Sequence, residues 1–231
     1  MLSKYRILST VLFFIGAFSI YYWMNYSNVY IRDEYHKRYI EHYKADFEKM
    51  ESDLSDNVQE VLTKYRSRTT KILVFTKHEC DMMIHEAERH ADVKGWTQKR
   101  HENYPTTDIP VTELNLTYPM VMSKVYELVI PALASLFEFD KRAIDVYDLF
   151  LIRYSAHQQN RLVQHHDGSL FSFIIPLNDD FDGGGTHLDG ETHRPDVGEA
   201  LLFCGQQKHS GVAITRGTRY VLAGFLYAMD Q

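Results

Sequence analysis

The sequence predicts an α+β domain whose C-terminal half is a small β sandwich or jelly roll, preceded by a single transmembrane helix and a helical stalk. Helical patterns come first along the chain and strand patterns follow, an order typical of α+β domains. With 231 residues, 45% of them hydrophobic, the chain can form one well-filled domain plus an appendage. The formal charge of −6 gives no global basic field, so we expect no nucleic-acid partner.

Residues 1–30 are interpreted as a cytoplasmic tip and a transmembrane signal anchor. The uncharged run from Ile7 to Met24 is near the lower limit of the about 17 to 25 residues that cross a bilayer as a helix. Lys4 and Arg6 precede it, so the positive-inside rule predicts a single-pass type II protein whose catalytic domain is lumenal, in the endoplasmic reticulum or Golgi. A cleaved signal peptide is the alternative, but no small-x-small cleavage site follows the run.

Residues 31–68 predict an amphipathic helical stalk. Apolar side chains recur at steps of three and four from Ile40 to Tyr65, with charged residues between them. Such a helix can lie on the catalytic domain, or it can pair with a second copy of the chain as a short coiled coil and give a homodimer. The sequence leaves both possibilities open.

The third predicted segment, residues 69–231, begins with a strand and a helix. The run from Lys71 to Phe75 is of β type, and the residues from Thr76 to Glu79 resemble a capping box that opens a helix through about His90. The stretch from Gly95 to Pro110 has no regular period and predicts a long ordered loop. Loops of this length often border an active site.

A second helix and four strands complete the predicted domain. Apolar residues recur at helical spacing from Tyr118 to Phe137, although Pro131 should end or kink this helix. Later runs are strand-like and are separated by a Gly-rich turn at 182–185 and by Arg216-Gly217. These runs are Tyr147 to Tyr154, Ser169 to Leu177, Ala200 to Cys204 and Tyr220 to Tyr227.

The two cysteines, Cys80 and Cys204, are too few for a disulfide framework or a thiolate metal site. One bridge between them could form in an oxidising compartment. A cysteine inside the apolar run that ends at Cys204 is more often a small buried hydrophobic residue. The sequence does not decide whether the two are bridged.

Three residues predict an iron(II) site. Residues i and i+2 of a strand point the same way, so His165 and Asp167 can face one cavity while His166 turns outward. An imidazole and a carboxylate supply two corners of the 2-His-1-carboxylate triad, which leaves open positions on the metal. We expect His209 to be the third ligand, because it follows a buried-looking strand and precedes Gly211, where the backbone can approach closely.

Arg219 stands ten residues after His209, at the start of the last strand-like run. Its planar guanidinium could bind a carboxylate in a bidentate manner at a fixed distance from the metal, which fits the distal carboxylate of 2-oxoglutarate. A rival His-x-Asp pair, His187 and Asp189, follows three glycines in a segment without strand alternation. Its side chains would not be rigidly aligned, so we expect it not to bind the metal.

These motifs together resemble a known family. In order they are Arg153-Tyr154, Gln159, Leu162, His165-His166-Asp167, Ser169, Leu177-Asn178, Phe181, Gly183-Gly184-Gly185-Thr186, His209-Ser210-Gly211, Thr215 and Gly217-Thr218-Arg219-Tyr220. This set is similar to the 2-oxoglutarate and iron(II)-dependent dioxygenases, particularly to the catalytic domain of the procollagen lysyl hydroxylases and prolyl 4-hydroxylases. The resemblance covers roughly residues 146–227.

The resemblance implies a double-stranded β-helix fold for the dioxygenase domain, residues 69–231. It implies iron bound at His165, Asp167 and His209, 2-oxoglutarate bound at Arg219, and O2 as the oxidant with ascorbate as reductant. Tyr154 matches a tyrosine that lines the co-substrate pocket in this family, while its alternative role is that of a core tyrosine on a strand. The chain has no room for the glycosyltransferase-like domains of animal lysyl hydroxylases, and the segment from Trp96 to Pro110 departs from the pattern.

The expected function is hydroxylation of an unactivated C–H bond, on a peptidyl lysine or proline of a secreted protein or peptide, with release of succinate and CO2. The same triad would equally serve a dioxygenase acting on a small molecule, a lipid or a glycan. A different alternative is a membrane-tethered binding or scaffold protein that has lost activity. The Gly-rich turn at Gly183 and the loop from Trp96 to Pro110 are candidates for the substrate rim, although both could be plain surface loops.

Overall fold

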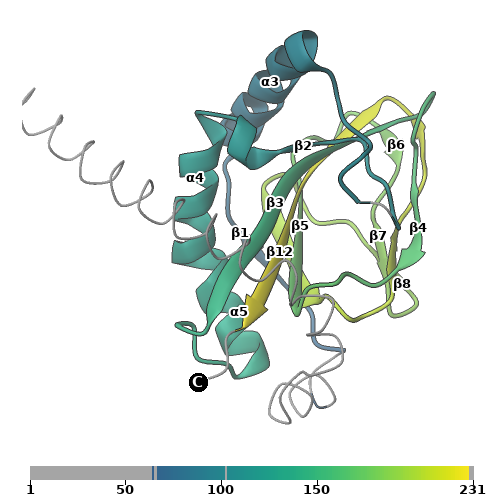
Figure 1. Cartoon of the computed structure of the whole chain (residues 1–231). Helices are drawn as coiled ribbons and strands as arrows, with labels where there is room; N and C mark the ends of the chain where they lie inside the picture. The colour runs from purple at the N-terminus through teal and green to yellow at the C-terminus, as the bar shows by residue number, and fades with distance from the viewer. Residues whose placement is uncertain (1–63, 65–66, 102, 229–231) are drawn as a thin grey trace, which may run out of the picture. The chain divides into compact units, whose positions relative to one another are not determined.

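The computed structural model describes residues 64, 67–101 and 103–228, all of which belong to one compact unit, Met50–Gln231. The predicted anchor, residues 1–30, and nearly all of the predicted stalk, residues 31–68, lie outside the described residues. Figure 1 shows three layers in the described part: helices on one side, a large sheet in the middle and a small sheet on the other side. The predicted α+β class is therefore confirmed, and the antiparallel sheets are consistent with a jelly roll.

The large sheet has six antiparallel strands in the order β1-β9-β5-β12-β3-β2. Its longest members, β3 and β12, pair over eleven positions with one bulge, and their length makes them the frame of the domain. The sequence predicted five of these strands with similar bounds, and only β2 was not expected. The strands are β1 (Thr70–Leu73), β2 (Asp108–Pro110), β3 (Ile144–Ser155), β5 (Phe171–Pro176), β9 (Glu199–Cys204) and β12 (Thr218–Ala228).

The small sheet has four short antiparallel strands in the order β4-β10-β7-β8, and a two-stranded ribbon joins β11 to β6. These strands are β4 (Leu162–His165), β7 (Thr186–Leu188), β8 (Glu191–His193), β10 (His209–Gly211), β6 (Asp182–Gly183) and β11 (Ile214–Arg216). The expectation that the segment around His187 is not a strand is wrong. Three residues are enough for β7 because it pairs on one side with β10 and on the other with β8.

Helix α3 (Lys77–Lys94) begins where the sequence predicts it. Thr76 is the N-cap: its hydroxyl accepts from the Glu79 backbone N–H, and the Glu79 carboxylate accepts from the Thr76 backbone N–H. Both halves of the capping box are thus present, and they satisfy two donors that a helix start leaves without partners. The helix runs four residues beyond the predicted end at His90, and Gly95 closes it.

The second helix shows how the chain accommodates Pro131. It begins as α4 (Thr117–Lys124), passes through a π-helical turn, η2 (Val125–Val129), and continues as α5 (Ile130–Phe137). A short 3-10 turn, η1 (Val111–Glu113), precedes it. The π turn leaves Pro131 in the first turn of α5, where its missing N–H is harmless. The helix therefore does not end at Pro131, and the predicted irregularity takes the form of a π turn directly before the proline.

The helix from Thr117 to Phe137 is also long and apolar enough to cross a membrane by length and composition. In the structure it packs on the large sheet, and Val121, Val125 and Leu133 are fully buried in the domain core. Its apolar character is therefore explained by packing within the domain.

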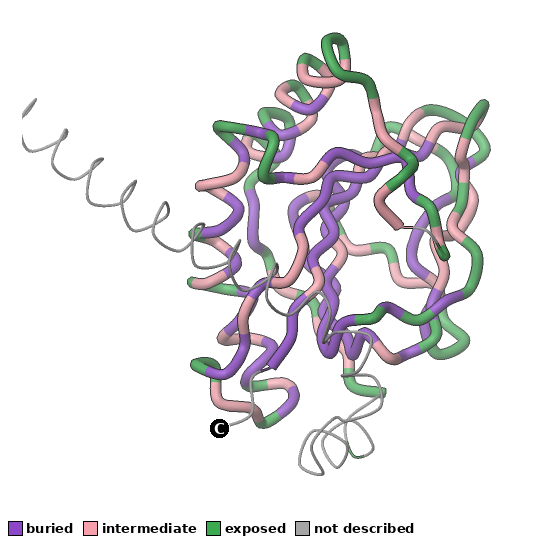
Figure 2. The backbone as a smooth tube through the Cα atoms, in the orientation of Figure 1, coloured by how far each residue is buried: buried purple, intermediate pink, exposed green. Residues whose placement is uncertain are grey.

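Both faces of the large sheet are buried, as the purple strands in Figure 2 show. On β12, Leu222 and Leu226 pack with the helices, while Val221 and Ala223 belong to a second cluster on the opposite face. This alternation follows from the period of two in a strand. The second face carries the cavity described below.

Gly198 marks a close approach between the start of β9 and the segment after β1. Its carbonyl accepts the backbone N–H groups of Val74 and Phe75, and its φ is +82°. A Cβ at this position would lie 1.9 Å from the Phe75 carbonyl oxygen. Only glycine fits such a contact without a shift of the backbone.

Gly198→Ala is therefore expected to lower the free energy of unfolding by more than about 2 kcal/mol, because backbone strain and a steric clash add. Gly190→Ala is the matched control, since its φ is also +82° but nothing lies within 4 Å of the added Cβ. Urea denaturation of both variants checks this. Equal losses in the two variants would show that the contact with Phe75 is unimportant.

The cysteines are both free and both buried. Cys80 lies on α3 and Cys204 at the end of β9, and each belongs to the main core. Burial raises the pKa of the Cys80 thiol to about 12. The structure thus supports the interpretation of these residues as small buried hydrophobic groups and shows no bridge.

Candidate metal centre and anion pocket

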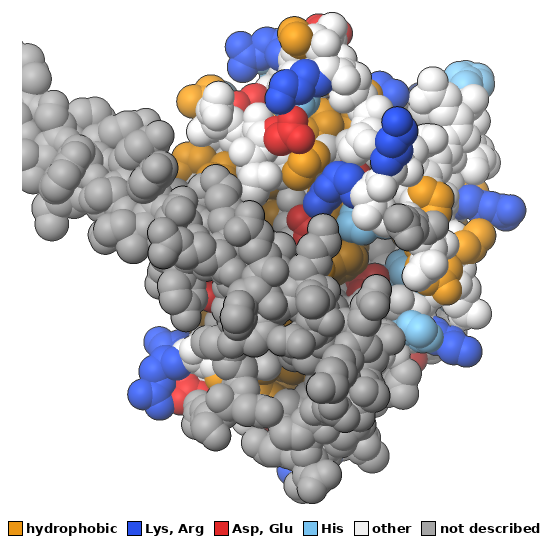
Figure 3. All heavy atoms as spheres, in the orientation of Figure 1, with side chains coloured by type: hydrophobic (Ala, Val, Ile, Leu, Met, Phe, Trp, Pro, Cys, Tyr) orange, Lys and Arg blue, Asp and Glu red, His pale blue; other side chains and the backbone are white. Residues whose placement is uncertain are grey.

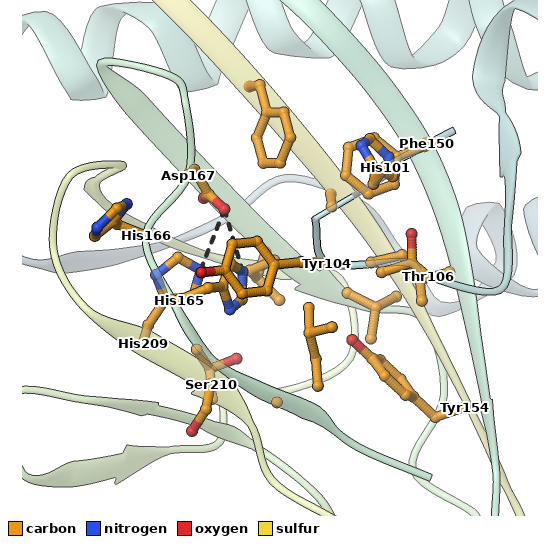
Figure 4. Close-up of a pocket in the computed structure, with 18 of the residues that line it drawn as sticks. His101, Tyr104, Thr106, Phe150, Tyr154, His165, His166, Asp167, His209 and Ser210 are labelled. Carbon is orange, nitrogen blue, oxygen red and sulfur yellow. Dashed lines mark ion pairs between the residues drawn. The ribbon is translucent and has the colours of Figure 1, made fainter. Parts of the chain in front are cut away.

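Strands β4 and β10 bring the predicted metal ligands together. His165 is the last residue of β4 and lies opposite His209, the first residue of β10. Asp167 lies just beyond the end of β4, so the prediction that it belongs to the strand is wrong. The i, i+2 relation still holds locally, because both side chains point into the same cavity (Figure 4).

The three side chains form a compact cluster. Asp167 Oδ1 lies 3.3 Å from His165 Nε2 and 3.5 Å from His209 Nε2. One donor atom from each residue falls within 4.8 Å of the others, and this is the one such group of three found among the described residues. All three side chains are buried, so water competes little for these atoms.

Backbone carbonyls set the orientation of both imidazoles. His165 Nδ1 lies 2.8 Å from the Val163 carbonyl oxygen, and His209 Nδ1 lies 2.8 Å from the Gln207 carbonyl oxygen. Since a carbonyl only accepts, each Nδ1 carries the proton. In a neutral imidazole Nε2 is then the lone-pair nitrogen, which is the form that binds a metal ion.

The electrostatics of the cluster favour an ionised carboxylate. Burial opposes ionisation of Asp167, but the close contacts of its carboxylate with His165, His209 and Ser172 outweigh it and hold the pKa far below its usual range. Burial alone would lower the pKa of His209, whereas the contact with Asp167 raises it above the ordinary value. The cluster therefore has an ionised carboxylate at its centre, and a divalent cation would neutralise its charge.

Arg219 lies in the same cavity on the opposite sheet. It is 3% exposed, and its Nη1 donates to the Gly185 carbonyl oxygen at 3.1 Å. Among the residues that the structure describes, it makes no ion pair with a carboxylate. Burial lowers the pKa of Arg219. A buried guanidinium that lacks an anion is costly, and a bound carboxylate would complete it.

Tyr154 faces Arg219 across the β3–β12 pair, where the two residues are direct partners. The guanidinium carbon lies 5.6 Å from the centre of the Tyr154 ring. Burial raises the pKa of the Tyr154 phenol to about 12, so the hydroxyl keeps its proton and can donate a hydrogen bond. In Figure 4 this hydroxyl points into the cavity. Both predicted anion-binding residues thus line one pocket.

The cavity that joins these groups has a volume of about 220 Å³. One of its walls comes from the loop between α3 and β2, which contributes His101, Tyr104 and Thr106. The Tyr104 ring lies 5.0 Å from the His165 ring, in front of the cluster in Figure 4. The sequence indicated this loop as a possible rim but did not single out Tyr104, because an aperiodic loop gives no signal of where its side chains point.

Two ion pairs and a glutamine fix this loop. Arg100 Nη1 donates to the fully buried Asp108 at 2.9 Å, and Arg100 Nη2 donates to Asp148 at 2.7 Å. Gln159 accepts from the Thr107 backbone N–H and donates to the Pro105 carbonyl oxygen. The loop is therefore held against β3 by long-range contacts that no local sequence pattern reveals. On the face of the molecule that Figure 3 shows, acidic and basic side chains of the described residues are interspersed.

The remaining histidines behave differently. His166 is exposed and lies at the side of the cavity, turned away from the cluster in Figure 4. His187 Nδ1 lies 3.2 Å from the Thr192 hydroxyl, and Asp189 contacts Gln207. The rival pair thus takes part in separate contacts and forms no metal-binding group among the described residues.

The chain is similar to known hydroxylases in sequence. It is 30% identical over 173 residues to procollagen-lysine,2-oxoglutarate 5-dioxygenase 1 of Rattus norvegicus, covering 66% of this chain and 23% of that protein. It is 29% identical over 170 residues to the rat multifunctional procollagen lysine hydroxylase and glycosyltransferase. The chain thus spans about a quarter of the length of these relatives. No family model matches it.

Solved structures show the same fold. A Pseudomonas putida prolyl-4-hydroxylase matches with a TM-score of 0.53 at 15% identity, covering 75% of this chain and 98% of the other. A viral collagen prolyl hydroxylase from Paramecium bursaria Chlorella virus-1 matches with a TM-score of 0.50 at 16% identity, covering 70% and 96%. The homologues and structural neighbours are thus 2-oxoglutarate-dependent dioxygenases and hydroxylases, and the fold is that of this group.

Proposed function

We propose that this chain, a homologue of the procollagen-lysine 2-oxoglutarate 5-dioxygenases, is itself an iron(II)- and 2-oxoglutarate-dependent hydroxylase. The observation that carries this proposal is the pairing, in one buried cavity, of a His-Asp-His cluster with an arginine that has no carboxylate partner among the described residues. A metal-binding group alone would fit many functions. A His-Asp-His cluster beside a buried guanidinium that lacks a carboxylate partner fits a site that binds both a cation and an anion.

The donor set fits iron(II). We propose His165, Asp167 and His209 as the ligands, since two imidazoles and one carboxylate on one side of a metal ion leave the other positions open. The carbonyl contacts at both Nδ1 atoms already present Nε2 in the correct tautomer. The protein therefore has little to reorganise when the metal binds.

The anion site fits 2-oxoglutarate. We propose that Arg219 binds its distal carboxylate and that the Tyr154 hydroxyl donates a second hydrogen bond. Bound iron and 2-oxoglutarate would supply O2-dependent oxidation of an unactivated C–H bond, with release of succinate and CO2. The chain's own residues hold both groups, exclude water and aim the target.

A peptidyl lysine or proline is the proposed target, because the relatives are named for procollagen lysine and two structural neighbours for prolyl residues. A small molecule, a lipid or a glycan is the alternative, since the same cluster would serve it equally. Ascorbate as reductant, a lumenal location reached through the residues 1–30 anchor, and a homodimer through the stalk complete the proposal.

The test incubates the purified full chain with iron(II), ascorbate, O2 and 2-oxoglutarate, with and without pools of lysine- and proline-containing peptides. Succinate release that increases with one pool, together with a mass gain of one oxygen in a peptide, supports the proposal. An inactive scaffold protein would bind no iron and release no succinate with any pool. That outcome would refute the enzyme reading.

Tyr104 is expected to act on the peptide side of the cavity. Tyr104→Ala should raise the KM for a peptide substrate about tenfold, equivalent to about 1.4 kcal/mol, while the KM for 2-oxoglutarate stays nearly constant. Tyr104 belongs to the loop that forms one wall of the cavity, and its ring lies against the ring of His165. Arg219, in contrast, lies on β12 in the large sheet. Steady-state kinetics with each substrate varied in turn measures this.

The matched variant is Tyr104→Phe, which keeps the ring that lies against His165 and should keep the peptide KM. If Tyr104→Ala changed the KM for 2-oxoglutarate and left that of the peptide unchanged, Tyr104 would belong to the co-substrate site instead.

A further inference from the structure

The carboxylate of Asp167 uses its two oxygens for different purposes. Oδ1 faces both histidines, whereas Oδ2 accepts a hydrogen bond from the Ser172 hydroxyl at 2.6 Å. Ser172 lies on β5, five residues further along the chain and in the other sheet. The contact therefore ties the end of β4 to the large sheet.

The direction of the hydrogen bonds can be worked out from the number of protons. Ser172 has one hydroxyl proton, and an ionised carboxylate can only accept, so Ser172 donates that proton to Asp167. The Ser169 hydroxyl lies 2.9 Å from the Ser172 hydroxyl and must then be the donor in that pair. The chain of bonds runs from Ser169 through Ser172 to Asp167, and each bond is directed toward the negative charge.

The backbone around Asp167 is held just as firmly. The Asp167 N–H donates to the Gly205 carbonyl oxygen at 2.8 Å, and Gln206 Nε2 donates to the Asp167 carbonyl oxygen at 2.9 Å. A Cβ on Gly205 would lie 2.3 Å from the Ser169 carbonyl oxygen, so the two loops touch directly. With main chain and Oδ2 both fixed, the side chain keeps one orientation.

Burial shows why this serine is unusual. Ser172 is 0% exposed and stands between Phe171 and Phe173 in an otherwise apolar strand. A hydroxyl in such a place is costly unless hydrogen-bonded, and an alanine would pack there without that cost. The sequence carries this signal as a lone polar residue in a hydrophobic run, but nothing local says what its partner is.

We infer that Ser172 is a positioning residue for the metal centre, which holds Asp167 so that only Oδ1 is presented to the metal ion. This inference rests on the proposed function. Occupation of Oδ2 by a hydroxyl makes the carboxylate a one-oxygen ligand. Because a two-oxygen carboxylate would fill a further position, Ser172 also keeps a position free for 2-oxoglutarate or O2.

The experiment titrates the full chain with Co(II) in the absence of O2 and records both affinity and the visible absorption spectrum. Ser172→Ala is expected to raise the Kd for Co(II) about 10- to 100-fold, as loss of a ligand's hydrogen-bond partner does in other metal sites. It should also change the spectrum, because the freed Oδ2 can reach the metal. Ser172→Thr restores the hydroxyl and should restore affinity and spectrum.

A matched control is available in the same domain. Thr117 is a buried residue on α4 whose hydroxyl donates to the Glu86 carboxylate at 2.7 Å. Thr117→Val removes the same type of hydrogen bond away from the cavity, so it should reduce stability without changing the Kd for Co(II). If Ser172→Ala does not fold, Ser172→Cys keeps the size but donates weakly, and it should weaken Co(II) binding as well.

Co(II) affinity and spectrum of the Ser172 variants equal to those of the unaltered chain would overturn the inference. An equal loss of affinity in Thr117→Val would also overturn it, since the effect would then reflect stability alone. The unaltered chain provides the reference for the proposed function. If it binds no Co(II), the proposed function fails first, and this result is distinct from a failure confined to Ser172.

Discussion

His165→Ala is expected to abolish iron binding, whereas His166→Ala should leave it nearly intact. His165 presents Nε2 to the cluster at 3.3 Å from Asp167, while its neighbour is exposed at the side of the cavity. Loss of one of three ligands removes most of the binding free energy, because the two that remain cannot hold the ion alone. Isothermal titration with iron(II) under anaerobic conditions, followed by succinate release, measures both effects.

The neighbouring pair is its own control, since the two variants differ by one position and remove the same side chain. Both variants should show the same circular dichroism spectrum, because either alanine can be accommodated without a change in the backbone of β4 or the turn that follows it. A loss of iron binding in His166→Ala with retention in His165→Ala would mean that β4 presents the other face. It would refute the proposed ligand set.

Arg219→Lys is expected to raise the KM for 2-oxoglutarate by about 10- to 100-fold, or roughly 1.4 to 2.8 kcal/mol, without weakening iron binding. A lysine keeps the charge but cannot reproduce two parallel N–H donors, and its ammonium group is harder to bury. Arg219 is 3% exposed, so water cannot replace the missing hydrogen bond. Initial rates of succinate release at varied 2-oxoglutarate measure the change.

Arg216→Lys is the matched control, because Arg216 precedes β12, is exposed and pairs with Asp182 at 2.7 Å. Exposed ion pairs contribute little, so this variant should keep the KM of the unaltered enzyme. An unchanged KM for 2-oxoglutarate in Arg219→Lys would remove Arg219 from the co-substrate site. The His-Asp-His cluster would be unaffected by that result.

Local signals in the sequence were sufficient for the parts of the fold that are themselves local. The capping box at Thr76 and Glu79 predicted the start of α3, because both hydrogen bonds are made within four residues. Pro131 indicated an interruption of the second helix, and a π turn lies directly before it, but the sequence did not show that the helix continues beyond this point as α5. The strand at His187 was missed because it has only three residues, too few to show alternation, and because one of its two partners, β10, is distant in sequence.

The same distinction between local and long-range signals applies to the candidate site. The spacing of His165 and Asp167 was enough to group them, and the structure brings His209 and Arg219 into the same cavity. Tyr104 and Ser172 were not singled out, since one depends on the path of a loop and the other on a contact between sheets. The metal ligands were found from their spacing, whereas Ser172, which contacts one of them, shows in the sequence only as a polar side chain in an apolar strand.

Strand β12 faces two clusters at once, and this links the robustness of the domain to its catalysis. Leu222 and Leu226 belong to the helical side, while Arg219, Val221 and Ala223 line the cavity from the same eleven residues. Weaker packing of the helices against the large sheet would therefore shift β12, the strand that carries the Arg219 guanidinium. Substitutions in the hydrophobic core should accordingly weaken the binding of 2-oxoglutarate before they unfold the domain. Selection for activity would then also act on the residues of the core.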